Sequence, residues 1–378
     1  MGLIHLTPPR NNMVQYQLKL KLTKTQQKTL DSWLWNLTGV WNWAIRKIEL
    51  DARDHIYHSS FDLSNLLVGH SVKVGIPSHV LQGVLAQAHL AWKRCFKKLA
   101  KRPHLKGIRN KLNSIPFPDP IKPAKNQRFT LPSLGPVKFH KQWIPDGRIK
   151  CSRLIKKSSG WHLCLFIDAE PKSILHIANG EVGIDPGFKH LLTLSTGEKI
   201  EHPRELEAKA KRLAQAQRGK TKKLVSRIHE KISNQRKDRN HKLSRRLIAE
   251  NNLIVFSKDN HQAIAKKFGK SVSSSSHGQL QRMLSYKSSF CGRVYLEVNP
   301  KNSTKTCSTC SSLTGPTGWD GLAVRQWVCE VCGTSHDRDC NAAMNTLIVG
   351  LGDNHERVAV ESRLKLSVPL ALGGELNG

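Results

Sequence analysis

The chain has 378 residues, and its 61 Lys plus Arg against 28 Asp plus Glu give a formal net charge of +33. This length is enough to bury more than one core, and the charge excess favours a polyanionic partner, of which nucleic acid is the default. No stretch approaches the ~20 apolar residues of a membrane span, and the first residues lack the apolar core of a signal peptide. We therefore expect a soluble cytoplasmic protein that makes no membrane contact.

The first third of the chain predicts a β-module with a helical insertion. Residues 13–22 alternate in the way a strand does, and residues 23–50 have helical spacing with Thr23 as a plausible N-cap. A second helical stretch covers residues 78–102. From about residue 127 the apolar period becomes two, which predicts short antiparallel strands separated by Gly and Pro turns.

The second half has a different character. Two or three meandering strands follow residue 181, and a long basic helical region covers about 203–251. The strand NNLIVFSKDN comes next, then a helix over 271–290 and a short strand that carries Glu297. Residues 352–378 show weak periodicity, which predicts a loosely held tail.

The basic helical region carries Arg and Lys on several of its faces at once. A charge run is usually only a solvated helix face. A lone solvated helix would not need cations all round, so we expect Arg227, Arg236 and Arg239 to contact phosphates of a nucleic acid.

Four cysteines form the strongest local motif. Cys307 and Cys310 make one CxxC pair, and eighteen residues later Cys329 and Cys332 make a second. Two such knuckles supply the four thiolates of a tetrahedral Zn²⁺ site, and the spacing is that of a zinc ribbon. Because no fifth ligand is evident, we expect a closed, structural zinc site; a redox-active dithiol pair is the alternative.

Three acidic residues form a second candidate set in a chain that is poor in acids. Asp185 ends an apolar strand, Glu297 lies within one, and Asp339 lies at a helix start. Each has an ordinary alternative: a turn residue, a polar residue on a half-buried strand, and an N-cap. Together they match the oxygen ligands of two Mg²⁺ ions, which clamp the attacking water and the leaving oxygen of a phosphodiester.

The order of the motifs in the C-terminal half resembles one known family. VGIDPGFKHLLTLSTG, the basic region ending HKLSRRL, EVNPKNSTKTCSTC, CEVCG and DRDCNAAMN together look like TnpB (OrfB), the transposon-encoded RNA-guided DNA endonuclease related to type V CRISPR effectors. The resemblance covers residues 181 to about 350, and the first third matches in layout only.

The resemblance implies a multidomain α/β fold. An RNase H-like (RuvC) nuclease domain with an inserted zinc ribbon would follow a β-barrel wedge domain that is interrupted by a helical recognition domain. The implied boundaries are 1–22 and 127–175 for the wedge, 23–126 for the helical domain, 176–300 and 336–351 for the nuclease domain, 301–335 for the ribbon and 352–378 for the tail.

In one place the chain departs from this family. The family commonly has its middle catalytic glutamate where this chain reads Ser257-Lys258-Asp259. Serine supplies no anionic ligand, and Lys258 would repel a metal ion. We expect Glu297, one strand further along, to complete the set of Asp185 and Asp339, with Asp259 as the alternative.

The resemblance also implies the partners and the activity. A guide RNA transcribed from the transposon end would direct metal-dependent hydrolysis of double-stranded DNA beside a short flanking motif, in a prokaryotic, nucleoid-associated setting. Arg338 would position the scissile phosphate, or pair with Asp337. A nuclease-dead RNA-guided repressor and a DNA-joining transposase are the alternatives, and the sequence leaves the oligomeric state open.

Overall fold

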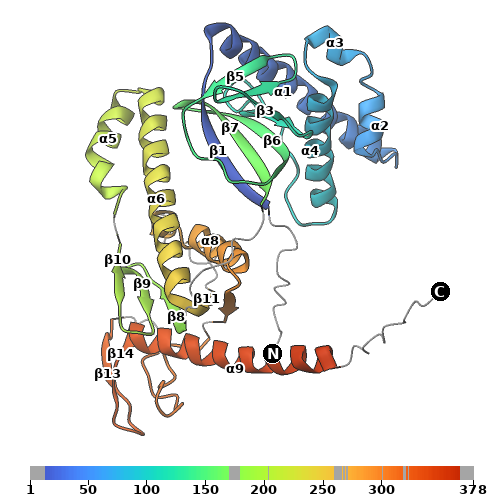
Figure 1. The fold of residues 1–378 in the computed structure, drawn as a ribbon. Coiled ribbons are helices and arrows are strands. Elements are labelled where there is room, and N and C mark those ends of the chain that lie inside the picture. Colours follow the sequence, from blue (N-terminus) through green and yellow to red (C-terminus); the bar gives the residue numbers. More distant parts are fainter. Residues whose placement is uncertain are drawn as a thin grey trace, which may run out of the picture. The chain divides into compact units, whose positions relative to one another are not determined.

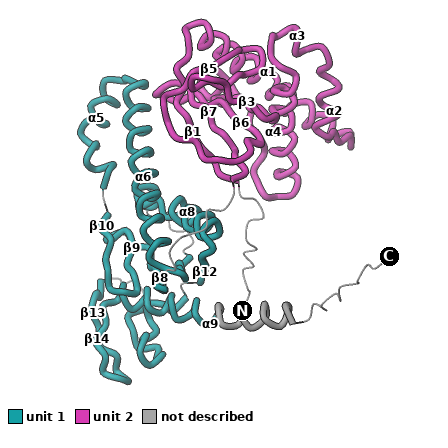
Figure 2. Tube along the Cα trace, in the orientation of Figure 1, with its two compact units in different colours: residues 1–9, 172–378 teal, residues 10–171 magenta. Residues whose placement is uncertain are grey.

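The computed structural model describes residues 13–169, 179–202, 204–258, 271–299, 301–317 and 323–366, and the single residues 266, 269 and 321. Side chains are described as far as Gly352. The chain divides into two compact units, residues 10–171 and the rest (Figure 2). Among the described residues, no helix is long and apolar enough to cross a membrane.

Unit 2, residues 10–171, contains a seven-stranded sheet in the order β2-β6-β7-β1-β5-β4-β3. All of its pairings are antiparallel. The strands are β1 (Met13–Lys21), β2 (Ser114–Phe117), β3 (Lys122–Ala124), β4 (Arg128–Leu131), β5 (Gly135–Phe139), β6 (Arg148–Lys157) and β7 (Gly160–Asp168). The predicted strands from residue 127 onward are confirmed.

The helices of unit 2 lie between β1 and β2 in the chain: α1 (Lys24–Arg53), α2 (Ser60–Asn65), α3 (His70–Val74) and α4 (Ser78–Phe96). Thr23 is the N-cap of α1, as predicted, and forms a capping box with Gln26. The range expected for the helical recognition domain, 23–126, also contains β2 and β3, which belong to the seven-stranded sheet. Their four and three residues are too short to show a period-two pattern, and the boundaries of this domain stay a prediction.

Unit 1 is built on a five-stranded sheet in the order β10-β9-β8-β11-β12. The strands are β8 (Gly180–Pro186), β9 (His190–Leu194), β10 (Lys199–Glu201), β11 (Asn251–Ser257) and β12 (Val294–Val298). β8, β9 and β10 are antiparallel neighbours, whereas β8, β11 and β12 run parallel. The carboxyl ends of three strands therefore meet at one edge of the sheet.

Helices cover both faces of this sheet (Figure 1). On one face, leucines of α6 (Lys222–Glu250) and α8 (His277–Phe290) pack on Ile184 and Phe256. On the other face, α9 (Arg338–Leu366) packs through Leu347 and Leu351 on Val255 and Leu296. A short 3₁₀ turn, η1 (Glu207–Lys209), and α5 (Ala210–Arg218) precede α6, and α5 packs against α6. We call the two faces the α6/α8 face and the α9 face.

The cysteine-rich segment forms a small hairpin, β13 (Gln326–Val328) and β14 (Ser335–Asp337), which leads directly into α9. The helix α9 continues to Leu366. The tail predicted from residue 352 is thus helical as far as Leu366, and its loose attachment stays a prediction; residues 367–378 lie outside the described part of the chain.

Candidate functional site

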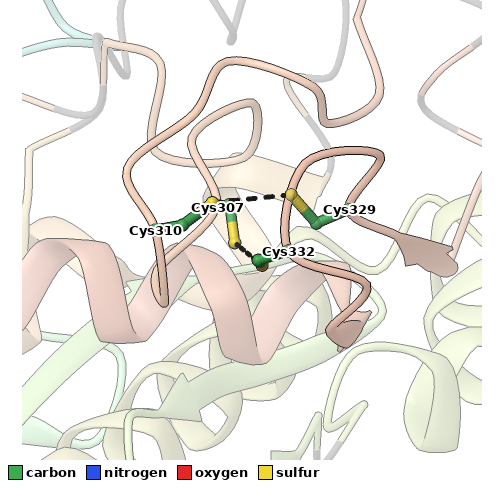
Figure 3. Close-up of side chains that lie close together, drawn as sticks. All are labelled: Cys307, Cys310, Cys329 and Cys332. Atoms are coloured by element: carbon green, nitrogen blue, oxygen red, sulfur yellow. Dashed lines mark hydrogen bonds between the residues drawn. The ribbon is translucent and has the colours of Figure 1, made fainter.

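The four cysteines of the two CxxC pairs lie together (Figure 3). Their sulfur atoms all lie within 4.8 Å of one another, and the pairs Cys307–Cys332 and Cys310–Cys329 are each 3.6 Å apart. A tetrahedron of Zn–S bonds of about 2.3 Å has edges of about 3.8 Å. This cluster can therefore hold a metal ion such as zinc, and its all-sulfur donor set suits zinc.

Both knuckles have the same backbone geometry. The residues that follow each CxxC pair, Ser311 and Gly333, adopt left-handed φ values of 64° and 69°. The hydroxyls of Ser312 and Thr314, which lie 3.2 and 3.3 Å from Cys329 Sγ, lower the pKa of this thiol to about 5. The site therefore favours a thiolate, the form that binds a metal.

A polar row crosses the five-stranded sheet at the carboxyl end of β8. Asp185 pairs with Thr193 of β9, and Thr193 pairs with Lys199 of β10. The last residues that pair between β8 and β11 are Ile184 and Phe256. Asp185 and Ser257 are the next residues of the two strands, so they lie at the same level of the sheet. Residues paired in register point to the same face. We call Ser257, Asp185, Thr193 and Lys199 the polar row.

The polar row faces α9. Gly183 lies two positions before Asp185 on the same face of β8. A Cβ at Gly183 would lie 2.1 Å from the carbonyl oxygen of Ala343 in α9, so only glycine allows the helix to approach this closely. Asp185 and the start of α9 are therefore on one side of the sheet.

Asp339 lies in the first turn of α9, where the helix dipole favours a negative charge. The cap is provided by Asp337, whose Oδ1 accepts bonds from the backbone N–H groups of Asp339 and Cys340. Asp337 Oδ2 pairs at 2.6 Å with Lys199, a member of the polar row. The Arg325 guanidinium lies 3.3 Å from both carboxylate oxygens of Asp339.

Glu297 lies on the opposite face. It pairs in register with Phe256, whose side chain belongs to the core of the α6/α8 face. Its Oε1 accepts a bond of 3.2 Å from the Tyr295 hydroxyl, and its Oε2 lies 2.8 Å from Lys258 Nζ. Burial, followed by the charge of Glu297, raises the pKa of Tyr295, so the hydroxyl remains a donor.

The structure thus brings Asp185 and Asp339 to one face and leaves Glu297 on the other. Within the described residues, the four cysteines form the only group of three or more possible metal ligands that lie close together. The register does not bring Glu297 to the face of Asp185 and Asp339, and its role as the third ligand stays a prediction. Asp259, the alternative, lies outside the described residues.

Ser257 occupies the place where the family commonly has its glutamate. Its side chain is 0% exposed, and its Oγ has no hydrogen-bond partner within the described part of the chain. A buried hydroxyl without a partner is costly. It marks the β11 end of the polar row, next to Asp185, as a place that can accept a further polar contact.

Arg239, expected to contact nucleic acid, is held inside unit 1. It pairs with Glu205 at 2.8 Å and donates to Ser275 O and Ser276 Oγ, both at 2.9 Å. Its side chain is 16% exposed, and burial lowers its pKa. These contacts indicate that Arg239 joins α6 to the segment before α8, and its expected phosphate contact stays a prediction.

The other predicted arginines have different environments. Arg227 is exposed on α6. Arg236 is half-buried and donates to Ser273 O at 2.8 Å. Arg338 donates to Gly321 O at 3.0 Å, and Asp337 pairs with Lys199 rather than with Arg338.

Lys199 and Arg325 were not predicted from the sequence. Their contacts with Asp337 and Asp339 depend on strand pairing and on the ribbon fold, respectively. A charged residue in a chain with 61 Lys plus Arg carries no local signal of such a role.

Comparisons with known proteins place the chain in a family. Residues 167–260 match the family model described as "Probable transposase", and residues 277–346 match "Cas12f1-like, TNB domain". A "Putative RNA-guided DNA endonuclease" of Streptomyces pristinaespiralis is 31% identical over 297 residues, which cover 73% of this chain and 72% of the relative. The chain therefore belongs to the TnpB-like family of RNA-guided DNA endonucleases.

Two further similarities agree with this family. The "Putative RNA-guided DNA endonuclease InsQ" of Escherichia coli K12 is 26% identical over 305 residues, covering 72% of this chain and 75% of the relative. A solved complex of Cas12f1 with sgRNA and target DNA has a TM-score of 0.55 at 14% identity, covering 86% of this chain and 83% of that chain. The latter likeness concerns the fold alone.

Proposed function

We propose that the protein is an RNA-guided DNA endonuclease encoded by a transposon. The observation that carries the proposal is the placement of Asp185 and Asp339 on one face of a sheet in which three strands end at the same edge. Ligand and catalytic sites of open α/β sheets lie at such carboxyl ends. The names of the relatives agree with this activity.

In this proposal, unit 1 contains the RuvC-type nuclease domain and its zinc ribbon, and unit 2 contains the wedge and helical recognition domains. The net charge of +33 suits a guide RNA and a double-stranded DNA target together. Exposed cations of α6, such as Arg227, contact the backbone of the guide–target duplex, and base pairing with the guide reads the sequence.

Asp185 and Asp339 provide hard oxygen ligands that suit Mg²⁺. When bound, such ions activate water and stabilise the leaving oxygen of a phosphodiester. Glu297 pairs with Phe256, which belongs to the core of the opposite face. Asp259 follows Ser257 by two positions in the sequence, and we propose it as the third carboxylate in place of Glu297.

The test is cleavage of a plasmid library, with a guide-matched target and random flanking sequence, by the protein purified with its transposon-end RNA in Mg²⁺. We expect guide-dependent cutting that is abolished by Asp185→Asn and by Asp339→Asn. Cutting that persists in both variants would show that the nuclease site lies elsewhere. Cutting without the guide would contradict RNA guidance.

A second candidate function is guided DNA binding without cleavage, as in a repressor. Two observations favour it: serine replaces a carboxylate at position 257, and Arg325 lies against Asp339. Tight guide-dependent binding by the wild type, with no cutting in Mg²⁺ or Mn²⁺, would identify this function instead.

A further inference from the structure

Two asparagines of α9 hold the backbone that leads into the first cysteine knuckle. Asn341 and Asn345 are 2% and 7% exposed. The Nδ2 of Asn345 donates to Ser303 O at 2.8 Å and to Thr306 O at 2.7 Å. The Nδ2 of Asn341 donates to the same two carbonyls at 3.3 and 2.8 Å.

Asn341 also reaches into the knuckle itself. Its Oδ1 accepts a bond of 2.9 Å from the backbone N–H of Ser308, which lies between Cys307 and Cys310. Because a buried amide group is costly unless it is hydrogen-bonded, these bonds hold the side chain in one orientation. We call Asn341 and Asn345, with the five bonds they make, the asparagine clasp.

The second knuckle is joined to the same helix by the chain itself. Cys332 is followed by β14, and β14 ends at Asp337, which caps α9. His336 of β14 is 8% exposed, and its Nε2 lies 3.0 Å from Cys307 Sγ of the first knuckle. The two knuckles are thus tied to α9 by independent routes, one covalent and one through the asparagine clasp.

A metal ion bound by the four cysteines would close these two routes into one ring. The ring contains the first two turns of α9, in which Asp339 lies two residues before Asn341 and six before Asn345. Helical geometry keeps these three residues within about 9 Å along the axis. Neither the covalent route nor the clasp alone fixes the helix start as firmly as the closed ring does.

We propose that the ribbon, when it holds its metal, positions Asp339, and that Asn341 and Asn345 are positioning residues through which it acts. The proposal rests on the proposed function, because Asp339 is assigned there as a metal ligand of the nuclease site. It differs from the view of the ribbon as an arm that only contacts nucleic acid. Loss of zinc or of the clasp then disturbs the carboxylate before it disturbs guided binding.

The experiment compares the full-length wild type with Asn341→Ala, Asn345→Ala and the double variant, each purified with its RNA. Asn234→Ala is the matched control, because Asn234 is exposed on α6. Zinc content is measured first. Amide hydrogen exchange of peptides covering 303–308 and 337–346 is then followed, with peptides of β8 and β11 as an internal check of folding.

We expect the clasp variants to exchange about tenfold faster in both peptides, while β8, β11 and the control remain unchanged. Zinc removal from the wild type should give the same pattern. In cleavage, the Mg²⁺ concentration for half-maximal rate should rise about 10- to 100-fold in the clasp variants, with guide-dependent DNA binding unchanged. A merely structural role would not shift the Mg²⁺ dependence.

Faster exchange confined to 303–308, with 337–346 and the Mg²⁺ dependence unchanged, would overturn the proposal. Asn345→Ala leaves the three bonds of Asn341 in place, so it should give an intermediate change if the double variant fails to fold. If the wild type cuts no DNA, the endonuclease function fails. The coupling between ribbon and helix is then still decided by hydrogen exchange alone.

Discussion

The two faces of the five-stranded sheet bury different kinds of side chain. The α6/α8 face is a continuous apolar core, and its one acidic residue on β12, Glu297, is matched by Tyr295 and Lys258. On β8 and β11 the α9 face is apolar only as far as the level of Val255, whereas on β12 Val298 continues the apolar cluster one level further. Beyond that level the polar row begins, and it leads to the capped start of α9.

This difference shows that the level of a carboxylate along the strands says less about its function than the face of the sheet on which its side chain lies. Glu297 and Asp185 lie one level apart in the same sheet, yet one completes an ion pair and the other lies beside a helix N-terminus. A helix N-terminus and converging strand ends are both places where charged ligands bind. Each of the following substitutions tests whether the two faces are as different as they are in this structure.

The largest expected effect is on the cleavage rate, and it distinguishes a carboxylate of the α9 face, Asp185, from one of the α6/α8 face, Glu297. Asp185→Asn should lower the guided cleavage rate by at least about 10³-fold, since it removes a ligand whose ion supplies several kcal/mol of stabilisation. Glu297→Gln should change the rate less than tenfold and destabilise unit 1, because it weakens the contact with Lys258. Single-turnover kinetics measures the cleavage rate, and urea unfolding measures the stability of unit 1.

A loss of cleavage in Glu297→Gln as large as that in Asp185→Asn, without loss of stability, would contradict the assignment of faces. Asp259→Asn is the companion variant. It should behave like Asp185→Asn if Asp259 supplies the third carboxylate.

The sequence predicted well what depends on near neighbours in the chain. The spacing of Cys307, Cys310, Cys329 and Cys332 fixed the ligand set, and the cluster forms as expected. The capping box at Thr23 predicted the start of α1, and Asp339 was placed correctly at a helix start. In each case the interacting groups lie within a few residues of one another or in a repeated local motif.

It predicted less well what depends on pairing between distant segments. Alternation showed that Glu297 lies opposite Leu296 and Val298, but not which of these sides is turned toward α9. That is decided by the register with β11, in which Glu297 pairs with Phe256, 41 residues earlier in the chain. The buried pairing of Arg239 was missed for a similar reason, because its partners Glu205 and Ser275 lie outside α6.

Arg239 provides the next test, since it fills the α6/α8 side of unit 1 rather than an exposed surface. Arg239→Ala leaves Glu205 buried and unpaired, which should cost about 3 kcal/mol in the free energy of unfolding of unit 1. Arg227 lies on the same helix but is exposed, so Arg227→Ala should leave the stability unchanged. It should reduce the slope of log K for nucleic-acid binding against log salt concentration by about one, since one phosphate contact is lost. Equal stability of the two variants would restore Arg239 as a candidate phosphate contact.

The close approach of α9 to the sheet can be tested with two glycines of that helix. A Cβ at Gly350 would lie 2.3 Å from Val255 Cγ2, whereas a Cβ at Gly352 would meet nothing within 4 Å. Gly350→Ala should therefore destabilise unit 1 by about 1–3 kcal/mol through overpacking. Gly352→Ala should stabilise it by up to about 1 kcal/mol through helix propensity. Thermal or urea unfolding measures the change in the free energy of unfolding for each variant. A change of the same sign in both variants would mean that α9 does not lie against Val255.

The smallest effect concerns pH and the α6/α8 face. Burial, aided by the charge of Arg245, lowers the pKa of Lys287 from 10.5 to about 8, and its Nζ donates to His241 O and Ser244 Oγ. Between about pH 8 and 10.5 the unfolded chain keeps a proton that the folded protein has released, so the free energy of unfolding rises with pH in this window.

Lys287→Met removes this rise. The difference between variant and wild type should be about 1 kcal/mol or less, because Lys287 is partly exposed and solvent screens its charge. Urea unfolding of both proteins at about pH 7.5 and 9.5 isolates the contribution, since all other titrating groups are shared. Parallel pH dependence of the two would show that Lys287 points to water and that this face is less closed than its apolar core indicates.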